Sequence, residues 1–147
     1  MSKSPNRVLV VVIGIIVIVV AVVAVLSSTR SVVILDRTTP AGAVQVYLKA
    51  ILGGRNTEAA RVFSPQSLCR VADLDRAYIA DTSRVNLLGS TISGTTAEVR
   101  VRVEIPSGSP LGDFMTEDHT FRLISSHGIW YLSGVPWPLY DCGVLIK

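Results

Sequence analysis

An uninterrupted apolar run dominates the beginning of the chain. Residues 8–26 contain no charge, and Gly14 is their one glycine. A helix of this length spans roughly 30 Å, which is the thickness of the hydrocarbon core of a bilayer. A buried core helix of a globular protein would carry polar residues on one face, and this run has none. The pattern therefore predicts a transmembrane helix over residues 8–26.

The residues around this run suggest its topology. Basic residues lie on both sides, Lys3 and Arg7 before it and Arg30 and Arg37 after it, so the positive-inside rule decides little. A short tail, residues 1–7, precedes the run and the bulk of the chain follows it. This favours a cytoplasmic N-terminus and an extracytoplasmic C-terminal domain, in a single-pass protein of the plasma membrane of a bacterial cell envelope.

A cleaved signal peptide, which would give a secreted form, is the alternative interpretation of the same run. The apolar region of a signal peptide is usually shorter and ends at an Ala-x-Ala-like site. Here the run continues into Ser27-Ser28-Thr29, where the small-residue site is poor. An uncleaved signal anchor is therefore the preferred prediction.

Beyond a polar linker over residues 27–38, the spacing of the apolar residues is typical of helices. Thr39 is a suitable N-cap, Pro40 suits the first helical position, and Gly53-Gly54 can end a helix. Between them, apolar residues recur at i, i+3, i+4 and i+7: Val44, Tyr47, Leu48 and Ile51. Two further helical segments are predicted over residues 57–63 and, after Ser64-Pro65, to about residue 72.

From about residue 84 the apolar period changes to two. Val99, Val101 and Val103 alternate with charged residues, which predicts an antiparallel strand with one buried and one solvated face. Turn residues separate this strand from others predicted over residues 85–93, 115–125 and 129–135. Helices followed by a four-stranded antiparallel sheet predict the α+β class. One domain, residues 39–147, accounts for all of them.

The formal net charge of +3 has little functional meaning once its position is considered. From Pro40 onward, acidic and basic residues are equal in number, so the excess belongs to the residues around the apolar run. The domain has no basic field and no basic-aromatic cluster. We therefore expect no nucleic-acid partner.

Cys69 and Cys142 are the only cysteines. In an oxidising compartment, two cysteines in one domain most simply form a disulfide, and two unpaired buried thiols are the alternative. The bond would close a long loop and stabilise the domain by about 4 kcal/mol in the chain-entropy model. The cysteines and histidines lack the paired short spacings of a zinc site, so neither a metal nor a cofactor is predicted.

The order of the elements suggests a known family when it is combined with a few residues at both ends of the domain. Thr39-Pro40 and Tyr47-Leu48 stand at its start, and Trp130-Tyr131 and Trp137-Pro138 near its end. Over roughly residues 39–142 the chain resembles the cone-shaped nuclear transport factor 2-like (NTF2-like) fold. Within it, the chain is similar to small membrane-anchored or secreted actinobacterial proteins of unknown function.

The resemblance implies about three helices packed on a curved four-stranded antiparallel sheet, around a hollow cone. NTF2-like proteins include isomerases, dehydratases, ligand-binding modules and protein-interaction domains, so the fold does not decide the function. The catalytic residues of the enzymes of that family do not align with this chain, and none are transferred. Pocket residues in such a cone are expected at Tyr47, His119 and Trp130.

The candidates for acid-base chemistry are few. His119 and His127 are the only histidines. His119 starts a predicted strand and faces either the interior or the solvent, whereas His127 stands in a predicted turn and is expected to be exposed. Asp81 and Asp113 lie near turn residues, where Asp is common for capping reasons alone. No catalytic residue is predicted.

These observations favour a non-enzymatic binding or accessory module of the cell envelope, tethered to the bilayer through residues 8–26. Its partner would be an envelope protein or an apolar small molecule. The alternative is a small enzyme with a hydrophobic pocket that carries out proton transfer of the isomerase or dehydratase type. The chain has no Gly-rich phosphate loop and no serine nucleophile motif to favour the alternative.

Overall fold

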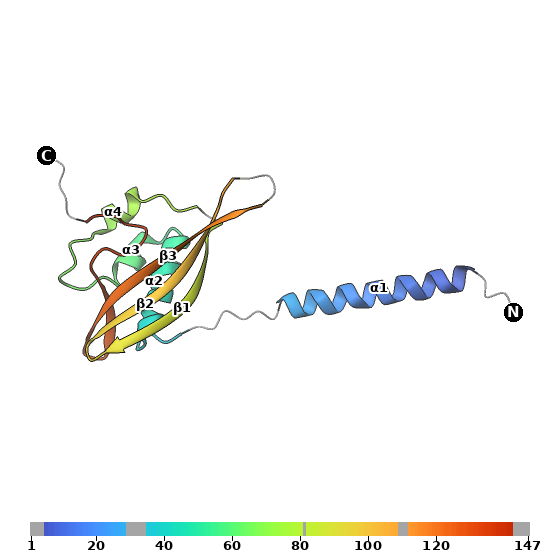
Figure 1. Ribbon diagram of the computed structural model, residues 1–147, viewed down its shortest axis with the longest axis horizontal. Helices are drawn as coiled ribbons and strands as arrows, with labels where there is room; N and C mark the ends of the chain where they lie inside the picture. Colours follow the sequence, from blue (N-terminus) through green and yellow to red (C-terminus); the bar gives the residue numbers. More distant parts are fainter. Residues whose placement is uncertain (1–4, 29–34, 81, 109–111, 143–147) are drawn as a thin grey trace. The chain divides into compact units, whose positions relative to one another are not determined.

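The computed structural model describes residues 5–28, 35–80, 82–108 and 112–142 (Figure 1). The chain divides into two compact units, Met1–Val33 and Ile34–Lys147. Helix α1, Pro5–Ser28, forms the described part of the first unit. The predicted tail (residues 1–7) and linker (residues 27–38) lie partly outside the described residues.

The side chains of α1 are described from Leu9 to Val20, and all of them are exposed. Among the described residues, no helix is both long enough and apolar enough to cross a membrane. This finding contradicts the transmembrane anchor predicted over residues 8–26, together with the bilayer contact, the single-pass topology and the plasma-membrane localisation inferred from it.

The second unit is an α+β domain with short helices and one antiparallel sheet. Its helices are α2 (Pro40–Leu52), α3 (Asn56–Ala60) and α4 (Val71–Arg76), and its strands are β1 (Arg84–Ser93), β2 (Thr96–Pro106), β3 (Phe114–Ser126) and β4 (Ile129–Ser133). The strands pair in the order β1-β2-β3-β4, each with its neighbour in sequence. The sheet is therefore a simple meander, and the helices lie on one of its faces (Figure 1).

Helix α2 forms where the apolar spacing and the capping residues predict it. The Thr39 hydroxyl accepts a hydrogen bond from the amide of Gly42 at 3.0 Å, which satisfies one of the free donors at the helix start. A Cβ atom at Gly42 would overlap the carbonyl oxygen of Asp36, so this position requires glycine. The stripe that includes Val44, Tyr47 and Ile51 is buried against the sheet.

The third helix begins later than predicted. The signal at Ser64-Pro65 suggested a start there, but α4 begins at Val71. The amide of Ser64 instead donates to the carbonyl oxygen of Leu132 in β4 at 2.8 Å, so this part of the chain joins the sheet edge. Helix α4 uses its own cap, because the Arg70 amide donates to the Asp73 carboxylate at 2.7 Å and lowers the pKa of that carboxyl.

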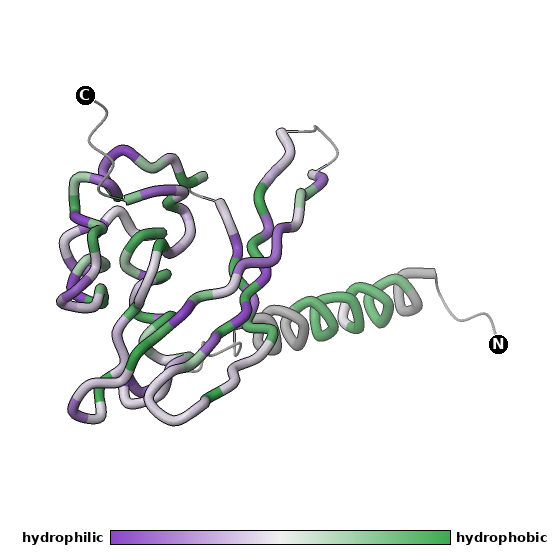
Figure 2. The backbone as a smooth tube through the Cα atoms, turned by 60° about the vertical axis from the view of Figure 1, so that its left-hand side comes forward, coloured by the Kyte–Doolittle hydropathy of each residue, from purple (hydrophilic) through white to green (hydrophobic). Residues whose placement is uncertain are grey.

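The core lies between α2 and one face of the sheet. Tyr47 is fully buried, and its ring centroid lies 5.8 Å from that of Phe63 and 5.9 Å from that of Phe121. Val101 and Val103 of β2 are buried, while Arg102 between them is exposed. Figure 2 shows the alternation of hydrophobic and hydrophilic residues along the strands. Aromatic rings thus fill the space between α2 and the sheet.

Strand β1 contains an irregularity that the apolar pattern did not reveal. Leu87 pairs with Val101 and Gly89 pairs with Arg100, so Leu88 is left without a partner in β2. Such a bulge adds one residue to a strand and bends it locally. Because of the bulge, the inward-facing positions before and after Leu88 remain on the same face of the sheet.

Candidate functional site

Two of the three predicted pocket residues meet at Trp137. The Tyr47 hydroxyl donates a hydrogen bond to the Trp137 carbonyl oxygen at 2.9 Å, and burial raises the pKa of Tyr47 above its ordinary range. The His119 ring centroid lies 5.7 Å from that of Trp137. Trp130 is also buried, but it pairs with Ser125, about 20 Å along β3 from His119.

His119 faces the same side of the sheet as the buried valines, because it pairs with Val101. Its Nε2 atom lies 3.1 Å from Oε2 of Glu117, and both side chains are partly exposed. Such a pair can exchange a proton with a ligand only where a pocket adjoins it. Neither side chain lines the two pockets described below.

The other described candidates for acid-base chemistry, His127 and Asp113, lie in or next to the loops between strands. His127 is exposed in the β3–β4 turn, with a positive φ of 52°. The backbone carbonyl of Asp113 accepts a hydrogen bond from the Ser107 amide at 2.9 Å and closes the base of the β2–β3 loop. Asp81 lies outside the described residues. Within the described ranges, no group of three His, Cys, Asp or Glu residues is placed to hold a metal ion.

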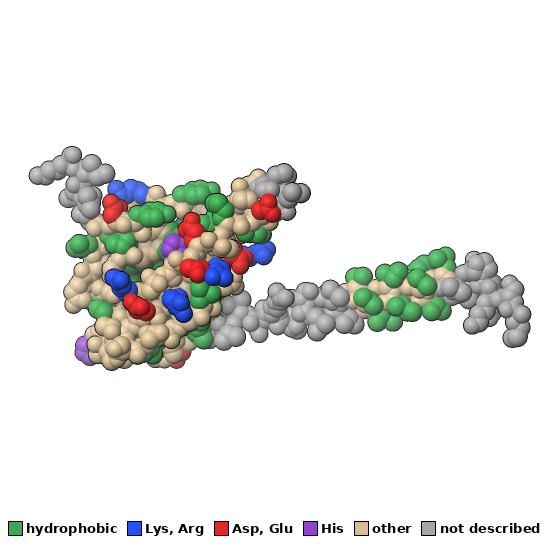
Figure 3. Space-filling model, in the orientation of Figure 1, with side chains coloured by type: hydrophobic (Ala, Val, Ile, Leu, Met, Phe, Trp, Pro, Cys, Tyr) green, Lys and Arg blue, Asp and Glu red, His purple; other side chains and the backbone are tan. Residues whose placement is uncertain are grey.

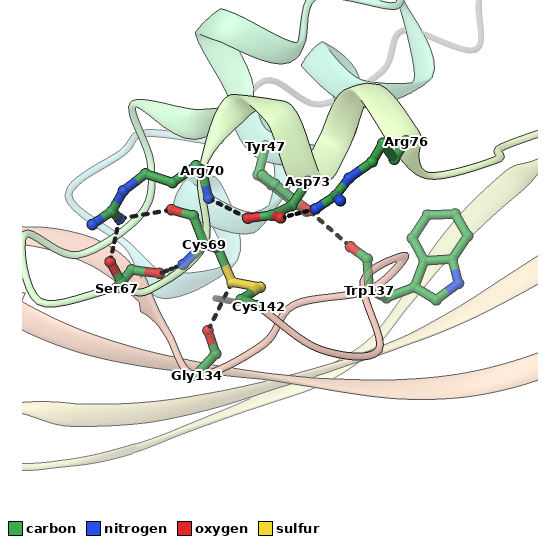
Figure 4. Close-up of a disulfide and its surroundings, with 9 residues drawn as sticks. All are labelled: Tyr47, Ser67, Cys69, Arg70, Asp73, Arg76, Gly134, Trp137 and Cys142. Carbon is green, nitrogen blue, oxygen red and sulfur yellow. Dashed lines mark hydrogen bonds and ion pairs between the residues drawn. A yellow bond between two sulfur atoms is a disulfide. The ribbon is translucent and has the colours of Figure 1, made fainter. Parts of the chain in front are cut away.

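The predicted disulfide between Cys69 and Cys142 is present, with 4.7 Å between the two Cα atoms (Figure 4). It ties the segment before α4 to the chain that follows β4. The Cys69 amide donates a hydrogen bond to the Ser67 hydroxyl at 3.2 Å, and the Cys69 carbonyl oxygen accepts one from the Arg70 guanidinium at 3.0 Å. Cys69 is therefore held in place from both sides.

A half-open pocket of about 320 Å³ lies beside this disulfide. The described residues that line it are uncharged: Ser64, Gln66, Ser67, Leu68, Cys69, Ile124, Ser133, Gly134, Val135 and Cys142. The hydroxyl and amide groups of these residues do not by themselves offer a general base or an activated nucleophile. A second pocket, of about 170 Å³, lies between α2 and α4, and its one carboxylate, that of Asp75, accepts a hydrogen bond from Asn56.

The outward face of the sheet carries charges that largely pair with one another. The Arg102 guanidinium donates two hydrogen bonds to the Asp118 carboxylate, at 2.7 and 2.9 Å, and lowers the pKa of that carboxyl. Asn86 of β1 donates to Glu104 of β2 at 2.9 Å. Positive and negative side chains are interspersed on this face (Figure 3), so it presents no field of one sign.

One edge of the sheet is covered. In β4, the Leu132 amide donates to the Val62 carbonyl oxygen and the Leu132 carbonyl accepts from the Ser64 amide, both at 2.8 Å. Phe63 and Leu132 thereby form an isolated parallel bridge. The segment from residue 62 to residue 64 thus occupies the hydrogen-bonding groups of Leu132 that point away from β3.

The other edge, formed by β1, is free. We call it the β1 edge, residues 84–93; no other segment among the described residues pairs with its outer side. Leu87, Leu88 and Ile92 are 52%, 40% and 57% exposed. Charged residues and prolines usually protect an edge strand from pairing with another strand. Beyond Arg84, β1 has neither. The bulge at Leu88 is the one protective feature present.

Sequence reasoning missed this edge. The dipeptide Leu87-Leu88 followed by Gly89 breaks the alternation of apolar and polar residues, and that break is the signal of a bulge. The lack of charge after Arg84 was also visible in the sequence. What the sequence did not reveal is which of the two outer strands would be covered by another part of the chain.

The sequence matches no model of a known protein family and no curated protein. A solved structure, that of a SEC-C motif containing protein from Rhodopseudomonas palustris, is similar in fold, with a TM-score of 0.52 and 17% sequence identity. The similarity covers 74% of this chain and 82% of the other. At this identity the likeness shows the fold alone.

These comparisons contradict the expected membership of the NTF2-like family, for which they give no support. The resemblance depended on element order and a few aromatic residues. Those aromatic residues have a structural explanation of their own. Tyr47 fills the space between α2 and the sheet, and its hydroxyl fixes the backbone of Trp137.

Proposed function

We propose that the domain is a non-enzymatic protein-binding module that accepts an extended strand of its partner along the β1 edge. The observation that carries the proposal is the difference between the sheet edges. Residues 62–64 cover the edge at β4, whereas the longer β1 has no such cover among the described residues and carries exposed apolar side chains. A free edge of this kind is a template for strand addition.

The proposed mode of binding divides affinity and specificity between backbone and side chains. The outward amides and carbonyls of β1 would form the ladder of hydrogen bonds to the added strand. Leu87, Leu88 and Ile92 would contact its side chains, with burial contributing about 25 cal/mol for each Å² of apolar surface removed from water. Because β1 has one charged residue, Arg84, the edge favours partners with apolar rather than charged strands.

The proton-transfer alternative has less support. His119 and Glu117 are the one His–carboxylate pair among the described residues, and neither lines the pocket beside the disulfide or the pocket between α2 and α4. An enzyme of the isomerase or dehydratase type needs a closed apolar pocket beside such a pair. The aromatic residues that would line it are packed in the core.

The experiment is a selection of linear peptides from a random display library against the full-length protein. Peptides that bind are then measured against two matched variants, Leu88→Lys on the β1 edge and Leu68→Lys, an exposed leucine away from it. We expect peptides with alternating apolar residues that slow amide exchange in β1. Their affinity should fall at least about tenfold with Leu88→Lys, which is about 1.4 kcal/mol, and remain unchanged with Leu68→Lys.

Two outcomes would contradict the proposed function. One is a selection that gives no peptide dependent on β1. The other is a set of peptides that bind both variants equally, or that protect the amides of another element. Unchanged far-UV circular dichroism for each variant shows that the substitution acts at the surface rather than on folding.

A further inference from the structure

We infer that the strand received by the β1 edge is β1 of a second copy of this chain, arranged antiparallel. Two four-stranded sheets would then continue into each other across a two-fold axis. The inference rests on the proposed function and extends it by naming the partner. The number of free edges, the position of charge in β1 and the order of its apolar residues support it.

The number of free edges limits how far such an assembly grows. Among the described residues, β1 is the outer strand without a partner on its far side, since residues 62–64 cover β4 at Leu132. A chain with one free edge can pair with one other copy and then has no edge left. The contact therefore closes as an isologous dimer instead of growing into a filament.

The charge in β1 favours the antiparallel arrangement. Arg84 stands at one end of the strand, and residues 85–93 carry no charge. Parallel pairing would place the two Arg84 side chains about 5 Å apart, whereas antiparallel pairing with Arg84 opposite Thr91 separates them by about 24 Å. In the sheet, Thr91 pairs with Glu98 of β2. Each Arg84 would then approach Glu98 of the other copy.

Glu98 is available for this contact. Its present partner, Arg122, is 3.8 Å away, and both side chains are mostly exposed. Arg84 lies with its guanidinium carbon 5.2 Å from the centroid of the Phe114 ring. Neither contact is buried, so a modest rearrangement of two long side chains would allow an ion pair between copies.

The apolar residues are self-complementary in the same register. With Arg84 opposite Thr91, Leu87 of one copy lies opposite Leu88 of the other, on both sides of the two-fold axis. These leucines are about half exposed in the single chain. Antiparallel pairing would remove them from water together, which is the driving force for association.

The test uses the full-length protein with a photoreactive amino acid at position 88 and, as the control, at position 68. A mixture of isotopically labelled and unlabelled protein is irradiated, and the cross-linked peptides are identified by mass spectrometry. We expect mixed-isotope products that join position 88 to residues 84–93 of the other copy. Position 68 should give none to that segment. This readout is specific for β1 and is not affected by association through α1.

Charge variants test the register. Arg84→Glu and Glu98→Arg should each reduce the mixed-isotope product at position 88, by about tenfold if one ion pair between copies is lost at each end. The double variant Arg84→Glu/Glu98→Arg should restore it. Two single variants mixed together provide the matched control: the mixed dimer should recover the product, since both of its contacts then pair opposite charges.

The possible results separate this inference from the proposed function. Cross-links between the two β1 strands that follow the charge pattern support both. If the protein gives no such cross-links, or forms open-ended assemblies, while library peptides still bind β1, the second copy is not the partner and the proposed function stands. If neither a second copy nor any peptide binds β1, both are wrong.

Discussion

Each outer strand of this sheet has backbone amides and carbonyls that point away from the sheet. Among the described residues, another segment bonds to these groups in β4 but not in β1. Strand β4 is short, 5 residues, and its Leu132 is bonded on the outer side by a segment from before α4. Strand β1 has 10 residues and is uncovered among the described residues. The difference shows that segments distant in the sequence determine whether an edge is covered, and that the composition of the edge strand does not.

The covered edge is held by contacts that are far apart in sequence. Cys69 and Cys142, which form the disulfide, are separated by 73 positions, and the Tyr47 hydroxyl reaches the Trp137 carbonyl from α2. Both contacts fix the chain that follows β4. No disulfide or buried hydrogen bond of this kind holds a segment against β1 in the described residues. The comparison can be tested by weakening each side in turn.

The largest effect is expected from removing the disulfide, in the double variant Cys69→Ala/Cys142→Ala. The free energy of unfolding should fall by about 4 kcal/mol in urea denaturation, because the unfolded chain regains the freedom of a long closed loop. The Leu132 and Ser64 amides should exchange faster, since the segment that covers β4 is released. Wild-type protein under reducing conditions is the control. A loss below about 1 kcal/mol would contradict this account.

The next test replaces one leucine at each edge. Leu132 is 1% exposed and Leu88 is 40% exposed. Leu132→Ala should cost about 3 kcal/mol because it leaves a cavity in the core, whereas Leu88→Ala should cost less than about 1 kcal/mol. Urea denaturation of both variants with the disulfide intact measures the difference. Equal losses would mean that β1 is as well buried as β4, and would remove the basis of the comparison.

A smaller effect is expected from Tyr47→Phe, which removes the hydroxyl that holds the Trp137 carbonyl. An unsatisfied buried carbonyl costs about 1–3 kcal/mol, and the loss should be seen at neutral pH. The variant Tyr140→Phe is the control, because Tyr140 is 90% exposed, and it should change stability by less than about 0.5 kcal/mol.

The same hydroxyl gives a pH dependence of known sign. Burial raises the pKa of Tyr47 in the folded state, so above about pH 10 the unfolded chain loses this proton while the folded chain keeps it. Its contribution to stability is complete below that pH and declines above it, by up to about 1.4 kcal/mol per pH unit. The gap between wild type and Tyr47→Phe should narrow between pH 9 and pH 11. A constant gap would contradict burial of the phenol.

Local patterns in the sequence were sufficient to predict much of the secondary structure of this domain. Thr39, Pro40 and the i, i+3, i+4 spacing predicted α2, and the alternation in β2 predicted the sheet, because both depend on neighbouring residues. The presence of two cysteines in one domain was sufficient to predict the disulfide. By contrast, Ser64-Pro65 looked like a helix start, but tertiary pairing with Leu132 overrides the cap signal. The free edge depends on that same pairing and was not predictable from local sequence.

The last test concerns the turn that leads into the covered strand. His127 has a φ of 52° and Gly128 a φ of 78°, so both central residues of the β3–β4 hairpin are left-handed. Asn tolerates this conformation better than His, and Asn-Gly is the preferred pair for such turns. His127→Asn should therefore stabilise the domain by a few tenths of a kcal/mol, as measured by urea denaturation. His127→Val should destabilise it, since a β-branched side chain is strained at positive φ. If both variants match wild type, the turn contributes nothing to the stability of β4, and the contacts with residues 62–64 alone secure the covered edge.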